Sequence, residues 1–266
     1  MSTPLIHNHL HTRSFSFWHF TLSFFILIFA VYILCSPHET RAGLIVNRTL
    51  YLGLTNGLVG HWTFDGKDMG GAGTTATDIS GQGNHGILTN GPVRAIGKIG
   101  QALYISTLSC VQVNQSSSLN TLSRFSLSLW AKPTVNAVYF LHKGDPGFPS
   151  PGWAFSLSSS GNSRLEFMQS LGAGSIDVLA GDGATTFGEW QYFTVVVDGS
   201  GTDANTRFYR NGIELSHTNH FGVGPGSPSD DSAYGLKIGS DEYSDCNGSG
   251  NQMTMDDVRI YNRVLS

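Results

Sequence analysis

Apolar and polar residues alternate with a period of two along much of the chain after residue 57. In Phe125-Ser-Leu-Ser-Leu129, every second side chain is apolar, which is typical of a strand with one buried face. Val195 and Val197 alternate less cleanly with their neighbours, as expected for a strand covered on both sides. Asn211-Gly212 separates two such runs and predicts a hairpin, because both residues of that turn adopt positive φ.

The same pattern predicts further short strands, with no long amphipathic helix among them. One helical turn is expected over 116–122. Strands are predicted over 58–64, 101–105, 110–114, 125–132, 137–143, 152–158, 165–169, 190–198, 206–210, 213–217, 236–239 and 254–261. Many short strands separated by turn signals predict an all-β sandwich or barrel.

A hydrophobic segment precedes these strands. The run Phe15–Cys35 is almost wholly apolar and predicts a helix long enough to cross a bilayer, which takes about 20 residues. Its most apolar part, Phe24–Leu34, is as short as the core of a signal peptide, and Thr40-Arg-Ala42 offers a cleavage site. A cleaved signal peptide and an uncleaved anchor that holds the protein to the membrane both remain open.

Both interpretations place the remainder of the chain outside the cytoplasm, either secreted or anchored at the cell surface. The expected organisation is a signal or anchor segment over 1–42, a spacer over 43–56 and one domain over 57–266. A continuation beyond Ser266 stays open.

Composition and charge exclude one class of partner. The chain has a formal net charge of −4, and only 13% of its 266 residues are charged. It lacks the basic patch that nucleic-acid binding requires, so no nucleic-acid partner is expected. Its 33 glycines agree with a turn-rich all-β domain.

Seven sequence blocks, in this order, resemble those of the laminin-G-like, concanavalin A-type jelly rolls found in bacterial surface proteins. They are Gly57-Leu-Val-Gly-His-Trp-Thr-Phe-Asp65, Asp78-Ile-Ser-Gly-Gln-Gly-Asn-His-Gly86, Gly97-Lys-Ile-Gly-Gln-Ala-Leu-Tyr104, Phe125-Ser-Leu-Ser-Leu-Trp-Ala-Lys132, Trp190-Gln-Tyr-Phe-Thr-Val-Val-Val-Asp198, Phe208-Tyr-Arg-Asn-Gly212 and Met253-Thr-Met-Asp-Asp-Val-Arg-Ile-Tyr-Asn-Arg-Val-Leu265. The resemblance implies a two-sheet antiparallel jelly-roll sandwich. It also implies extracellular binding of a carbohydrate or a surface protein, and seldom catalysis.

The resemblance further implies a structural calcium ion where the first and last strands meet. Asp256 matches the aspartate that begins the last strand in related jelly rolls, and Asp65, Asp78 and Asn84 lie in turns that offer further oxygen ligands. Converging carboxylates would repel each other without a cation. Alternatively, these side chains cap the backbones of their own turns.

Loops before the final strand form a second candidate site. Asp241 and Asp245 supply carboxylates, and Tyr234 and Tyr243 supply aromatic rings that stack on a sugar face. Such residues are also ordinary solvated loop acids and aromatics that cap the core.

Other side chains favour a structural role. The tryptophans Trp62, Trp130, Trp153 and Trp190 are predicted to lie in the core. The side chains of Gln112, Asn114, Ser126 and Ser128 are expected to point outward. Their chemistry is unremarkable for ligand binding, so a display module without a small ligand stays an alternative function.

The cysteines permit one disulfide in the exported part. In a jelly roll, Cys110 at the start of a strand and Cys246 in a late loop can lie at the same end of the sandwich. We expect them to pair in an oxidising compartment, with two free thiols as the alternative.

Catalysis is not expected. Glucanases of this fold carry two acids in a Glu-x-Asp-x-x-Glu strand, and none of the five glutamates of this chain has that spacing. A glycoside hydrolase is therefore the less favoured alternative to a binding module.

Overall fold

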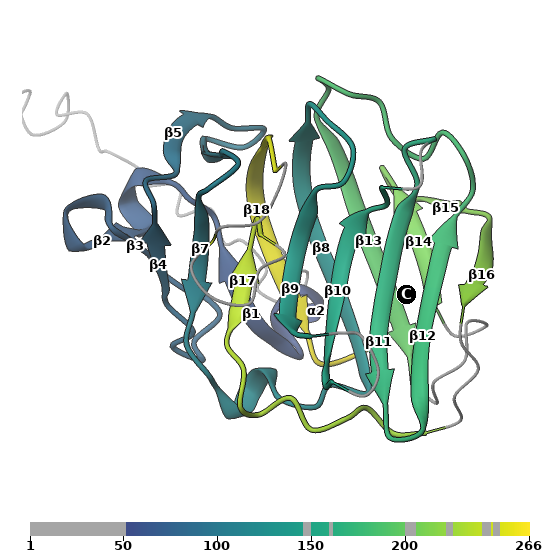
Figure 1. Ribbon diagram of the computed structural model, residues 1–266. Coiled ribbons are helices and arrows are strands. Elements are labelled where there is room, and N and C mark those ends of the chain that lie inside the picture. The colour runs from purple at the N-terminus through teal and green to yellow at the C-terminus, as the bar shows by residue number, and fades with distance from the viewer. Residues whose placement is uncertain are drawn as a thin grey trace, which may run out of the picture. The chain divides into compact units, whose positions relative to one another are not determined.

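The computed structural model describes residues 52–145, 150–159, 162–199, 206–221, 226–240, 246 and 251–266, apart from the side chains of 218–221. Within these residues the fold is a sandwich of two antiparallel sheets with almost no helix, as the sequence predicts. Figure 1 shows the larger sheet in front and the smaller one behind it. The predicted N-terminal helix lies outside the described residues. No described helix has the length and apolar content needed to cross a bilayer.

The smaller sheet has eight strands among the described residues. Its order is β15-β14-β13-β8-β18-β6-β5, and β1 also pairs with β18. The bounds are β1 Leu58–Trp62, β5 Val93–Ile96, β6 Gln101–Ile105, β8 Arg124–Pro133, β13 Gln191–Asp198, β14 Thr206–Arg210, β15 Ile213–Leu215 and β18 Met253–Tyr261.

The larger sheet has ten strands in the described part of the chain. Its order is β16-β12-β11-β10-β9-β17-β7-β4-β3-β2. The bounds are β2 Met69–Gly70, β3 Thr75–Ala76, β4 Gly86–Thr89, β7 Cys110–Val113, β9 Tyr139–Gly144, β10 Gly152–Leu157, β11 Leu165–Leu171, β12 Gly174–Ala180, β16 His217–Phe221 and β17 Leu236–Ile238. The short helices are α2 Leu52–Thr55, η2 Gly66–Asp68, η3 Gly71–Gly73 and η4 Ser117–Leu119.

The core fills the space between the sheets. The longer strands β8, β12 and β13 contribute every second residue to it, which is the period-2 pattern read from the sequence. Phe125, Leu127 and Leu129 of β8 are all fully buried. The predicted hairpin is present, with Asn211 at φ 52° and Gly212 at φ 79°.

The predicted core positions of the tryptophans are confirmed for two residues and wrong for two. Trp62 and Trp153 are buried, as predicted. The prediction for Trp130 and Trp190 is wrong, since both are partly exposed. Trp130 has the same parity in β8 as Ser126 and therefore faces away from the core, where Lys98 Nζ lies 5.0 Å from its ring centroid.

The short helix α2 falls within the predicted spacer and contacts the end of the chain. Arg263 donates hydrogen bonds to the carbonyl oxygens of Gly53 and Asn56. Asn262 N donates to Gly57 O at 2.8 Å. These contacts tie the segment before β1 to the residues that follow β18.

Candidate functional site

A cavity of about 530 Å³ opens on the outer face of the ten-stranded sheet. Small-molecule sites in proteins enclose roughly 300–1,000 Å³. The polar side chains that line it come from β7, β9, β17 and the segments next to them. They are Gln112, Asn114, Gln115, His142, Tyr234 and Lys237.

Strand register brings three of these residues into one row. Lys237 of β17 lies directly opposite Gln112 of β7 on one side and His142 of β9 on the other. Their neighbours Val111 and Ile238 belong to the core, so the row faces outward. Residues far apart in the sequence thus form one polar surface.

His142 is neutral over most of the pH range. Its side chain is buried and contacts the ring of Tyr139 edge-on, at a centroid distance of 5.8 Å. Burial lowers the pKa of His142 to about 4, the charge of Asp145 opposes this, and the charge of Lys237 adds to it. A neutral imidazole offers one hydrogen-bond donor and one acceptor, which suits a sugar hydroxyl.

Tyr234 stands at the rim of the cavity, 37% exposed. Tyr234 N donates to Asp231 O at 3.0 Å, and the Gln115 amide donates to Ala233 O. A Cβ on Gly235 would lie 2.4 Å from Val113 O, so only glycine lets this segment pass so close to β7. The turn thereby places Tyr234 among the residues that line the cavity.

A buried ion pair supports that turn. Lys143 Nζ lies 3.0 Å from Asp231 Oδ1 and donates to Asp231 O at 2.6 Å, while Thr121 N donates to Asp231 Oδ1 at 2.8 Å. Burial lowers the pKa of Lys143, and the charge of Asp231 opposes the shift. The pair anchors the turn that carries Tyr234.

Two of the predicted calcium ligands flank one glycine turn in the other sheet. Asp256 Oδ2 accepts a hydrogen bond from Ile99 N at 2.8 Å, and Asp65 Oδ1 accepts one from Gln101 N at 2.8 Å. A Cβ on Gly97 would lie 2.7 Å from Asp256 Oδ2, and one on Gly100 would lie 2.1 Å from Asp65 Oδ1. The turn between β5 and β6 therefore fits closely against both carboxylates.

Asp256 retains an unsatisfied oxygen. Asp256 is 1% exposed, and its Oδ1 has no hydrogen-bond partner in the described structure. Burial raises the pKa of Asp256 to about 6; hydrogen bonds from the Ile99 and Lys98 amides lower it, and the charges of Asp257 and Asp65 raise it further. An orphaned buried carboxylate oxygen beside a second carboxylate is the environment that a cation relieves.

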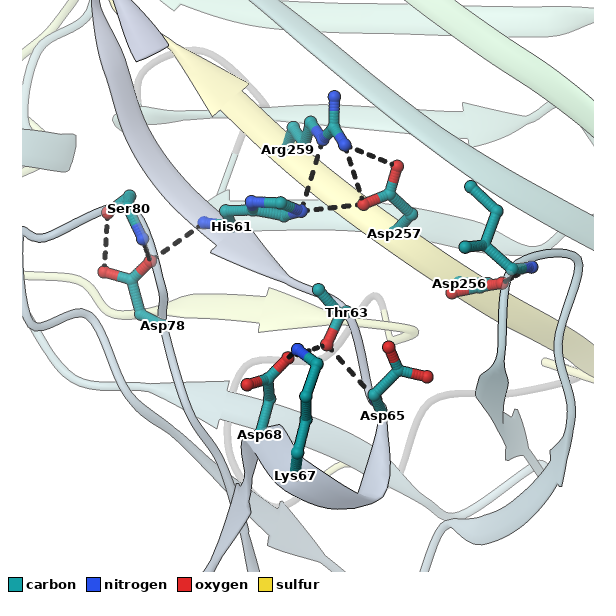
Figure 2. Close-up of polar contacts among 11 residues, drawn as sticks. His61, Thr63, Asp65, Lys67, Asp68, Asp78, Ser80, Asp256, Asp257 and Arg259 are labelled. Atoms are coloured by element: carbon teal, nitrogen blue, oxygen red, sulfur yellow. Dashed lines mark hydrogen bonds and ion pairs between the residues drawn. The ribbon is translucent and has the colours of Figure 1, made fainter. Parts of the chain in front are cut away.

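A bulge in β18 separates the neighbouring acid from this pair. The register shifts between Asp256 and Arg259, and Asp257 takes a φ of 50°. Asp257 Oδ1 lies 2.7 Å from His61 Nε2, and its Oδ2 lies 2.9 Å from an Arg259 nitrogen (Figure 2). Burial would raise the pKa of Asp257, but the hydrogen bond from His61 and the charge of Arg259 lower it.

Asp78 and Asn84 belong to a different network. Asp78 accepts four hydrogen bonds, from His61 N, Ser80 N, Ser80 Oγ and Asn84 N. Asn84 Nδ2 donates to Val59 O at 2.6 Å, and Trp62 Nε1 donates to Asn84 O at 2.9 Å. These contacts assign both residues to holding the turn after β3 against β1. Within the described residues, no three His, Cys, Asp or Glu side chains are grouped to hold a metal.

The remaining predicted residues have separate outcomes. Cys110 and Cys246 form a disulfide with their Cα atoms 5.5 Å apart. Of the predicted ligand-binding residues, Tyr234 lines the cavity, whereas Asp241, Tyr243 and Asp245 lie outside the described residues. The structure adds His142 and Lys237, which no local sequence pattern marks as partners.

Two antiparallel sheets packed face to face in this strand order define a jelly-roll β-sandwich. The model of the concanavalin A-like lectin/glucanases superfamily matches residues 107–266. The chain belongs to this superfamily. No curated protein matches the chain.

Solved structures share the fold at low sequence identity. Domain 4 of AbnA, a GH43 extracellular arabinanase from Geobacillus stearothermophilus solved with arabinotriose, has a TM-score of 0.55 and 20% identity over 79% of this chain and 94% of that one. The binding domain of Paraclostridial Mosquitocidal Protein 1 has a TM-score of 0.57 and 18% identity over 80% and 50%. The binding domain of botulinum neurotoxin serotype G has a TM-score of 0.54 and 14% identity over 79% and 48%. The chain thus spans about half of each toxin binding domain.

Proposed function

We propose that this protein is a carbohydrate-binding module whose ligand site is the cavity lined by Gln112, Asn114, His142, Tyr234 and Lys237. The observation that carries the proposal is the chemistry of that lining. Amide, imidazole and phenol groups pair with sugar hydroxyls, and a part-exposed aromatic ring offers an apolar face. The arabinotriose complex of the similar AbnA domain supports the same ligand class.

The proposal is for binding without hydrolysis. Glycoside hydrolysis uses a pair of carboxyl groups on either side of the scissile bond. The described side chains that line the cavity include no such pair. The module would act outside the cytoplasm, as the hydrophobic segment before it and the disulfide both suggest.

A structural calcium ion forms part of the proposal. Asp256 and Asp65 would hold it, together with backbone carbonyls, and its charge would neutralise the carboxylates beside the β5–β6 turn. The ion would stabilise the meeting point of the terminal strands. It takes no part in ligand contact, because the cavity is on the other sheet.

A glycan array tests the proposal. The full chain, purified in a detergent without a sugar headgroup, is screened against plant and animal oligosaccharides, with arabinotriose as the first probe, in calcium. Selective binding is expected. Loss of one hydrogen bond costs about 1 kcal/mol, so His142→Ala should weaken binding roughly fivefold. Thr194→Ala, on the other sheet, is the matched control and should leave binding unchanged.

Absence of binding by folded protein would contradict the carbohydrate proposal and favour a display role. Binding that His142→Ala and Tyr234→Ala both leave intact would show that the ligand site lies elsewhere.

A further inference from the structure

The disulfide lies beside the cavity. Cys110 begins β7 and Gln112 follows two residues later, so both side chains are on the outer face of the sheet. Val111, between them, is in the core. The bridge therefore holds Cys246, which is distant in sequence, next to a residue that lines the proposed ligand site.

Gln112 is in contact with the bridge itself. Its Nε2 donates a hydrogen bond to Cys246 Sγ at 3.3 Å. Glutamine is among the side chains that lose most rotamer freedom when they are fixed. A glutamine that is already held by the sulfur binds its ligand with a smaller entropic cost than a mobile one.

Cys246 occupies a backbone conformation that needs support. Its φ is 59°, in the left-handed region that residues other than glycine and asparagine seldom adopt. Such a conformation persists only when the surroundings hold it. The covalent bond to buried Cys110 supplies that restraint. The position of the Cys246 sulfur that Gln112 contacts therefore depends on the disulfide.

We propose that Cys246 is a positioning residue of the cavity: paired with Cys110, it holds the Gln112 amide for ligand, and full affinity requires the oxidised protein. The inference rests on the proposed function, because it assumes that the cavity is the ligand site. Reduction by a dithiol transfers two electrons and two protons to the Sγ–Sγ bond, which breaks to give two thiols, while the reductant becomes a disulfide. The module then reaches its full affinity only in an oxidising compartment.

The first test needs no ligand. The side-chain amide signals of Gln112 are identified in the nuclear magnetic resonance spectrum of the full chain by their loss in Gln112→Ala. They are expected to shift and sharpen when dithiothreitol reduces the bridge. Unchanged Gln112 signals in the reduced protein would overturn the inference, whatever the protein binds.

The second test separates positioning from stability. Binding to the glycan array, with arabinotriose as the first probe, is measured for the parent, Gln112→Ala, the Cys110→Ser/Cys246→Ser variant and the combination. With the disulfide present, Gln112→Ala should weaken binding roughly fivefold. In the Cys110→Ser/Cys246→Ser background, adding Gln112→Ala should cause no further loss of affinity. An equal penalty in both backgrounds would assign the bridge to stability alone and overturn the inference.

Two controls keep the outcome clear. If the cysteine-free variant fails to fold, the parent reduced with dithiothreitol below its melting temperature replaces it in the same comparison. If the oxidised parent binds no glycan, the proposed function fails, and the amide signals of Gln112 still decide whether Cys246 positions that side chain.

Discussion

Replacing Asp256 by asparagine removes a buried carboxylate, and the expected effect on stability depends on both pH and calcium. The pKa of Asp256 in the folded protein is about 6, against an ordinary value of 3.8. At pH values between these two pKa values, the folded state keeps the proton of Asp256 while the unfolded state releases it. Without calcium, stability is therefore lost as pH rises through this window.

The magnitude follows from the two pKa values. A tenfold change in proton affinity corresponds to about 1.4 kcal/mol, so the full change amounts to roughly 3 kcal/mol. A domain of this size shifts its melting temperature by about 2–4 °C per kcal/mol. About 2.4 kcal/mol of this change falls between pH 4 and pH 7.5. In EDTA, the melting temperature of Asp256→Asn should therefore rise by roughly 5–10 °C relative to that of the parent across this range.

At pH 7.5, calcium should close this difference between the two proteins. An ion present at a hundred times its Kd stabilises the folded state by about 2.7 kcal/mol, and the variant has lost its ligand. Differential scanning calorimetry of parent and Asp256→Asn in EDTA and in calcium, at pH 4 and 7.5, measures this directly. The lowered pKa of His142 makes stability fall as pH falls, which opposes the effect of Asp256. Because both proteins contain His142, this contribution cancels when their melting temperatures are subtracted.

A second carboxylate provides the matched control. Asp78 accepts four hydrogen bonds, so Asp78→Asn should destabilise the protein equally in EDTA and in calcium. A difference in melting temperature between parent and Asp256→Asn that does not change with pH in EDTA would refute the electrostatic reasoning. If calcium leaves that difference in melting temperature unchanged, the calcium site is refuted.

Three smaller predictions concern other parts of the domain. Ligand affinity should stay constant from about pH 8 to 5 and weaken near pH 4, where His142 gains a proton and loses its acceptor; calorimetric titration with the bound glycan checks this. Lys143→Met should destabilise the protein by roughly 3 kcal/mol, because it leaves the Asp231 carboxylate buried without its cation, and a melting temperature lowered by less than 2 °C would contradict this. Gly212→Ala should cost about 1 kcal/mol in urea unfolding because φ is 79°, whereas Gly172→Ala, which also faces open space, should change stability by less than about 0.5 kcal/mol.

The sequence predicts the sandwich well because its strands carry local signals. The strands at 101–105 and 206–210 have the predicted bounds, and the Asn211-Gly212 turn joins its hairpin as expected. In the short strands β4 and β5, the alternation of apolar and polar residues is too short to predict a strand from the sequence. The strand β12 was missed although Ile176 and Val178 alternate correctly toward the core.

Trp130 shows how residue type can mislead where pattern does not. Its parity with Ser126 and Ser128 in β8 already places it on the polar face. The prediction of a core position followed the usual burial of tryptophan, and the structure follows the alternation.

The ligand cavity depends on strand order, which no local pattern encodes. Gln112 was predicted to point outward, but its significance arises only when β7, β17 and β9 lie side by side and add Lys237 and His142. The same holds for the proposed cation site: Asp65 and Asp256 are predicted individually, whereas only the folded structure brings the β5–β6 turn against both of them.

The position of β18 has a consequence for how the protein is made. This late strand pairs with β8, β6 and β1, so it lies inside the eight-stranded sheet rather than at its edge. Until residues 253–261 leave the ribosome, β6 and β8 expose unpaired backbone edges, which are prone to pair with other chains. Folding must therefore follow synthesis of nearly the whole domain, and pairings over such sequence distances close slowly. Export in an unfolded state, or a chaperone that shields these edges, would suit this order of assembly.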